Sequence, residues 1–208
     1  MPIFLLSPAN CGGNRARIVL SERASFDLAM RLRTQGASLG EVFSFMSGLY
    51  FRGKLTYAKA FGRAPEGCEF EGGAFVITPS AGLRSPDTMV TVDAIRGFAG
   101  VDVSLDNPKY RRPLERSAKG LAAEIGETPV VLLGSIASPK YVDVLLKIFG
   151  ERLMFPQEFV GRGDMSRGGL LLRCAAAGQE LTYIPVAGAI RHGVRPPKLD
   201  PATRVKVQ

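Results

Sequence analysis

Short, wholly apolar runs alternate with longer amphipathic stretches along most of the chain. Turn-forming residues bound each run, and we predict buried strands at Ile3–Leu6, Ala74–Thr78 and Val130–Leu133, a short edge strand at Leu153–Phe155, and a last strand at Leu181–Pro185. Continuous apolar strands are typical of parallel sheets that are covered on both faces. The alternation of strands and helices therefore predicts an α/β fold with a mostly parallel central sheet flanked by helices.

The segments between these strands carry helical periodicity. Ser38 and Glu41 stand three residues apart and form a capping box, which predicts that a helix begins there. Tyr50–Phe61 is predicted as a loop that leads into a helix. Further helices are predicted over residues 22–35, over Tyr110–Ile125 and from Pro139 onward.

One glycine-rich stretch, Phe159–Arg173, carries the strongest local signal. Its loop contains Arg162, Asp164 and Arg167, and Ser166 is placed to cap the helix that follows. Glycines let an anion approach the backbone, and the first N–H groups of a helix favour negative charge, so the stretch suits a phosphate. The alternative is a plain turn between a strand and a helix, because the Gly-Lys-Ser/Thr ending of a phosphate loop is absent.

Composition excludes several classes of protein. The chain contains no apolar run of the roughly 20 residues that span a bilayer, and Met1–Leu6 lacks the basic leader of a secretion signal. The cysteines, Cys11, Cys68 and Cys174, form no disulfide framework or zinc motif, and a single histidine excludes a histidine-rich metal site. We expect a cytoplasmic protein without a metal or cofactor, with one domain over residues 1–190 and a basic, proline-containing tail over residues 191–208.

The formal net charge of +8 points to a polyanionic partner. Nucleic acid is the first expectation, and the alternative is a basic protein that binds no polyanion. Four loops, at residues 7–15, 79–88, 134–141 and 161–169, are expected to leave the carboxyl ends of strands and to form one cleft, since ligands bind at that edge of such sheets.

The residues of this expected cleft fall into three groups. Tyr50 and Tyr141 are expected to stack on bases. Asn10, Ser135 and Ser166 offer polar contacts to a phosphate or a base edge. The cations expected to hold phosphates are Arg15, Arg52, Lys54, Lys140, Arg162 and Arg167. For the aromatic and basic segment from Tyr50 onward, the alternative is a helix with a core-facing side and a solvated basic side.

Two carboxylates leave an enzymatic alternative open. Asp87 and Asp164 are both expected on loops at one sheet edge, where they could act as acid and base on nucleosides, nucleotides or bases in nucleic acid, as in a glycosylase or ribosyl transferase. The plainer alternatives are an Asx turn for Asp87 and an ion pair with a neighbouring arginine for Asp164. Cys11 beside Arg15 could be a thiolate, but no histidine is near it in the sequence, which favours a buried, inert cysteine.

Several segments, in order, resemble the YaaA family of bacterial peroxide-stress proteins. They are the N-terminal FLLSPAN and the segments Phe45–Tyr57, Val76–Asp87, Leu132–Tyr141 and Gly161–Gly169. The chain departs from the family at Asn10, which replaces a lysine, and in the last loop, which lacks a Lys-Lys pair. The resemblance implies an α/β core with a positively charged cleft that binds DNA, in preference to RNA, and limits oxidative DNA damage.

Overall fold

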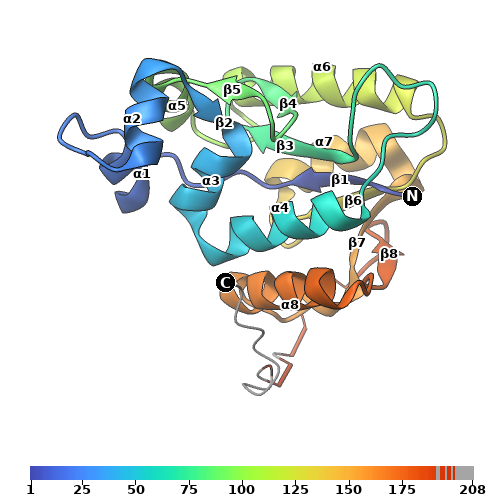
Figure 1. The fold of residues 1–208 in the computed structure, drawn as a ribbon. Helices are drawn as coiled ribbons and strands as arrows, with labels where there is room; N and C mark the ends of the chain where they lie inside the picture. The colour runs from blue at the N-terminus through green and yellow to red at the C-terminus, as the bar shows by residue number, and fades with distance from the viewer. Residues whose placement is uncertain (191–192, 195, 198, 200–208) are drawn as a thin grey trace.

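The buried runs form the central sheet of an α/β fold (Figure 1). The computed structural model describes residues 1–190, 193–194, 196–197 and 199; most of the predicted tail lies outside the described residues. The strand order is β4-β3-β1-β6-β7-β8, in which β3, β1, β6 and β7 are parallel and β4 and β8 are antiparallel edge strands. The strands are β1 (Ile3–Leu6), β3 (Ala74–Thr78), β4 (Gly82–Arg84), β6 (Val130–Leu133), β7 (Leu153–Pro156) and β8 (Tyr183–Pro185).

Helices cover both faces of this sheet. α4 (Leu49–Phe61) and α8 (Asp164–Ala177) lie side by side on one face, and α6 (Pro108–Glu124) packs with α7 (Pro139–Phe149) on the other (Figure 1). A small second sheet pairs β2 (Ala37–Ser38) with β5 (Met89–Val90). The remaining elements are α1 (Asn14–Val19), α2 (Asp27–Thr34), α3 (Leu39–Ser47), α5 (Val92–Ala99) and two short 3-10 turns, η1 (Gly150–Arg152) and η2 (Gln157–Phe159). Within the described ranges, no helix has the length and apolar character needed to cross a membrane.

The sheet has a switch point between its two central strands. After β1 the chain crosses to β3 on one side, and after β6 it crosses to β7 on the other. β1 and β6 end side by side: the N–H of Ser7, just after β1, donates to the carbonyl of Leu133, the last residue of β6, at 3.2 Å. In open parallel sheets this opening between diverging connections is where ligands bind.

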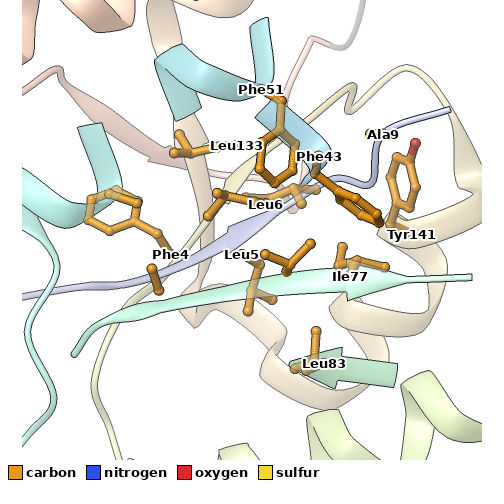
Figure 2. Packing of buried hydrophobic residues seen from close by; sticks show 14 of the residues in the cluster. Phe4, Leu5, Leu6, Ala9, Phe43, Phe51, Ile77, Leu83, Leu133 and Tyr141 are labelled. Atoms are coloured by element: carbon orange, nitrogen blue, oxygen red, sulfur yellow. The ribbon is translucent and has the colours of Figure 1, made fainter. Parts of the chain in front are cut away.

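The core forms on both sides of β1, as alternation along a strand requires. In Figure 2, Leu6 and Phe51 lie on one side of β1 and Leu5 lies on the other. Phe4, on the side of α4, packs edge-on against Tyr57 with ring centroids 5.6 Å apart. The strand is fully buried along its length, which explains its unbroken apolar sequence.

Several details of the elements differ from the sequence expectations. Tyr50–Phe61 is helical throughout, because α4 begins already at Leu49, after Gly48. Ser166 does not cap α8: the helix starts two residues earlier, at Asp164, after an extended Gly163. Leu153–Phe155 belongs to an internal strand, since β8 covers the edge of β7, and that last strand begins only at Tyr183.

Candidate functional site at the carboxyl edge of the sheet

Five helices present their N-termini at the carboxyl edge of the parallel strands. α1, α7 and α8 begin after β1, β6 and β7, whereas α4 and α6 run back along the sheet to the starts of β3 and β6. The hydroxyl of Tyr110 in α6 donates to the carbonyl of Lys140 in α7 at 2.9 Å, which joins two of these N-termini. The guanidinium of Arg15 in α1 lies against Gly48, the residue before α4. The N-termini therefore surround one region.

The first turns of these helices carry cations rather than acids. Of the five, only α8 has an acidic first-turn residue, Asp164. The basic residues in the first turns are Arg15, Arg52, Lys109, Arg111, Lys140 and Arg167. A cation at a helix N-terminus opposes the helix dipole, at a cost of about 0.3–1 kcal/mol each. This arrangement disfavours the folded protein alone and favours a bound anion.

Lys54 lies inside the site rather than on its surface. The residue is 1% exposed, and its Nζ donates to the carbonyl of Ser7 at 2.7 Å and to Ser7 Oγ at 2.8 Å. The same Nζ lies 4.5 Å from the ring centroid of Tyr50 and 4.9 Å from that of Phe51. Burial lowers the pKa of the ammonium to about 7, opposed by the charge of Asp164. The predicted contact between Lys54 and a phosphate is therefore not offered by this geometry, because α4 turns that side chain inward.

Two tyrosines and an ion pair complete the cluster around Lys54. Tyr50 is 7% exposed, and its hydroxyl finds no hydrogen-bond partner among the described residues. Arg167 lies 3.6 Å from the carboxylate of the exposed Asp164, and it donates to the carbonyl of Phe159 at 2.9 Å. Burial raises the pKa of Tyr141 to about 12, with a further contribution from the negative charge of Asp164. The two predicted stacking rings are thus buried rather than presented on the surface.

The structure does not bring Asp87 together with Asp164. Asp87 is exposed and pairs with Lys59 near the other end of α4, at 2.9 Å. The reason is the direction of β4: it is antiparallel to β3, so the residues after it return toward the amino ends of the parallel strands. The Asx turn considered for Asp87 is also absent; instead its N–H donates to Ser85 Oγ at 3.2 Å.

The other predicted residues lie around the entrance to this edge. The side chain of Asn10 is exposed and accepts from the N–H of Gly12 at 3.0 Å, which forms a local turn. Arg52 is exposed, and Ser135 is half-buried in the turn before α7. Lys140 places its Nζ 5.3 Å from the ring centroid of Tyr141.

Arg162 stands before the first turn of α8. Its Nη1 donates to Ser166 Oγ at 3.3 Å, so these two predicted residues contact each other. The Nε of Arg162 is buried and has no hydrogen-bond partner among the described residues. It is a second buried polar group without a hydrogen-bond partner among the described residues, after the Tyr50 hydroxyl.

Ser7 is the residue that sequence reasoning missed. In the sequence it is only one residue of the loop 7–15, yet it is 6% exposed and provides both acceptors of Lys54. The available signal was its position directly after a wholly apolar strand, where a polar side chain lies at the carboxyl edge. Its partner in α4 could not be identified from spacing, because 47 residues separate the two.

Cys11 is buried, and this burial disfavours its thiolate form. Its Sγ lies 3.6 Å from the carbonyl of Ala9, and burial raises the thiol pKa to about 12. Arg15, the cation considered as its activator, donates instead to the carbonyl of Phe45 at 3.2 Å. In the part of the chain that the structure covers, no three His, Cys, Asp or Glu residues gather to hold a metal ion.

Compared with known proteins, the chain matches no family model, no curated protein and no solved structure.

Proposed function

We propose that this protein binds nucleic acid, with DNA as the expected partner, at the carboxyl edge of its sheet. The observation that carries the proposal is the set of cations in the first turns of five helices that open on one region. Positive helix ends and cationic side chains there act on the same anion, and a polyphosphate backbone supplies several anions in a row. The net charge of +8 adds long-range attraction.

The exposed cations are better placed than the buried ones to contact the phosphates of a nucleic acid. Arg52 is exposed and Lys140 half-buried, each in a first turn, whereas Lys54 is enclosed and the side chain of Arg167 is only 11% exposed. We assign phosphate contacts to Arg15, Arg52 and Lys140. The resemblance to the YaaA family extends this proposal to protection of DNA under oxidative stress in the cytoplasm.

Fluorescence anisotropy with labelled single-stranded, duplex and gapped DNA, and matching RNA, tests the proposal across a salt series. The double variant Arg52→Gln, Lys140→Gln removes two phosphate contacts, so the slope of log affinity against log salt should fall in magnitude by about 1.8 for duplex DNA. The matched control is Lys119→Gln, Lys147→Gln, which removes the same charge from exposed residues more than one turn beyond the first turns of α6 and α7.

If both double variants weaken binding and reduce the salt slope equally, the net charge of the protein, and not this edge of the sheet, holds the nucleic acid. Absence of binding to every probe at low salt would overturn the proposal as a whole.

The second candidate is an enzyme that acts on nucleosides, nucleotides or bases in nucleic acid. The buried hydroxyl of Tyr50 favours it, because this hydroxyl finds no hydrogen-bond partner among the described residues and belongs to the ring that Lys54 Nζ approaches; such a group is suited to bind a substrate. Asp164 is the carboxylate available to this site, since Asp87 lies elsewhere. Release of a base or a ribose phosphate that is lost in Asp164→Asn would support this candidate.

A further inference from the structure

We propose that Ser7 and Lys54 form a nucleophile–base pair that attacks a phosphate ester bound at the carboxyl edge of the sheet. The pair is defined by the 2.8 Å contact between Lys54 Nζ and Ser7 Oγ. The choice of a phosphorus electrophile rests on the function proposed above; the pair itself rests on its own geometry.

The surroundings of Lys54 are those of an amine rather than of a paired ammonium. A buried lysine that serves stability alone normally meets a carboxylate. Within the described ranges, no carboxylate lies within salt-bridge distance of Lys54, and both hydrogen-bond acceptors come from Ser7. A neutral amine fits this site: one N–H donates to the carbonyl of Ser7 and the lone pair accepts the hydroxyl proton. The lowered pKa of Lys54, about 7, agrees with this assignment.

Ser7 occupies the position that a nucleophile needs. It follows β1 at the switch point, where its N–H is fixed by the carbonyl of Leu133. Gly134 lies beside it, and a Cβ there would be 3.2 Å from Ser7 Oγ, so the neighbouring backbone comes close only because a glycine stands there. Ser7 is 6% exposed and Lys54 1%, so the serine is the member of the pair nearer to solvent.

Two further groups suit the charge of a phosphoryl centre. The Tyr50 hydroxyl, buried and unpartnered among the described residues, can donate to a phosphoryl oxygen. Arg167, close enough to act electrostatically on both Tyr50 and Lys54, supplies positive charge. Donors fixed beside developing negative charge stabilise a transition state of this kind.

The reaction balances within the site. Ser7 Oγ bonds to phosphorus while its proton passes to Lys54 Nζ; the bond from phosphorus to the leaving oxygen breaks, and that oxygen takes the proton from the ammonium. Water then attacks the phosphoserine, gives one proton to Lys54, and the bond to Ser7 Oγ breaks. The serine oxygen recovers the proton from Lys54. No metal or redox partner is needed for these steps.

A fluorophosphonate probe tests the pair without a known substrate. Its phosphorus bonds to an activated serine and loses fluoride, and peptide mapping by mass spectrometry locates the adduct. We expect labelling at Ser7, none at that position in Ser7→Ala, and a labelling rate at least about 100-fold lower in Lys54→Met. Lys54→Arg is expected to fail as well, because a guanidinium keeps its proton. Lys59→Met, on the exposed side of the same helix, is the matched control.

The pH profile keeps the test valid even if a Lys54 variant does not fold. Labelling of the unaltered protein should rise with pH through an apparent pKa near 7 and then level. Absence of an adduct at Ser7, or a rate that does not change between pH 6 and 8, would overturn the pair. DNA binding retained in Ser7→Ala while labelling is lost would separate this inference from the binding function.

Discussion

Gly53 and Gly168 meet where α4 crosses α8, and neither position has room for a methyl group. A Cβ on Gly53 would lie 2.6 Å from the carbonyl oxygen of Gly168, and a Cβ on Gly168 would lie 2.7 Å from the carbonyl oxygen of Leu49. The two helices run in the same direction at this close distance, so their first turns stand side by side. This contact places Lys54 near Asp164 and Arg167.

A methyl group at this crossing should separate the helices. We expect Gly53→Ala to destabilise the protein by about 3 kcal/mol, at the upper end of the usual cost of overpacking. Urea unfolding followed by circular dichroism measures it. Gly120→Ala in α6 is the control: nothing lies within 4 Å of its Cβ, and we expect a gain of about 0.5–1 kcal/mol. Equal effects of the two substitutions would contradict the crossing as described.

The buried amine should make stability depend on pH. The pKa of Lys54 is lowered from 10.5 to about 7 in the folded protein, so between these values the unfolded chain binds more protons and stability rises with pH. Relative to Lys54→Met, the unaltered protein should gain on the order of 2 kcal/mol between pH 6 and pH 9. Urea unfolding at several pH values checks this, and Lys59→Met should show no such trend. A difference in the free energy of unfolding between the unaltered protein and Lys54→Met that stays constant with pH would argue against a buried, titrating amine.

The hydroxyl of Tyr57 anchors the last strand to α4. It accepts from the N–H of Leu181 at 2.7 Å and lies 2.6 Å from the hydroxyl of Tyr183. Tyr57→Phe leaves the N–H of Leu181 without its acceptor, so we expect a loss of about 1–2 kcal/mol. Tyr183→Phe keeps that acceptor and should cost less. Thermal unfolding of both variants shows which one loses more stability. A larger loss in Tyr183→Phe than in Tyr57→Phe would be inconsistent with this role of Tyr57.

Cys11 should be the least reactive of the three cysteines. It is buried, and its raised pKa leaves almost no thiolate at neutral pH, whereas Cys68 and Cys174 are half-buried. Labelling the native protein with a maleimide at pH 7.5, with sites located by mass spectrometry, should modify Cys11 last. Rapid modification of Cys11 in the folded state would instead place it on an accessible surface.

The sheet could be predicted well because its signal is local. An unbroken apolar run such as Val130–Leu133 indicates a buried strand wherever it pairs, and Pro139 begins its helix as expected. The beginning of α4 could not be predicted, because Gly48 and Gly53 read as loop residues. The reason for a glycine at position 53 is a tertiary contact: α8 approaches α4 there through Gly168, which is distant in sequence.

The site could be predicted only as a region. The convergence of the loops after β1, β6 and β7 at one edge follows from strand order, and Arg15 and Lys140 lie in the helices that begin after two of these loops. The sequence could not show which side chains of α4 face solvent. Arg52 is exposed and Lys54 is buried, although only two positions separate them. Asp87 was expected at this edge but lies elsewhere, because β4 runs antiparallel to β3. The sequence carries no signal for that direction.

The central place of β1 has a consequence for how the protein is made. Phe4 pairs with Ala74 on one side and with Val131 on the other, so β1 leaves the ribosome well before either of the strands that pair with it. Until residue 133 has been synthesised, its apolar side chains have no complete sheet to enter. β6 can therefore add to β1 only after a long intervening segment has been made, β7 and β8 add after it, and contact order makes these pairings slow. When β6 pairs with β1, Ser7 meets Leu133, and the centre of the carboxyl edge is formed.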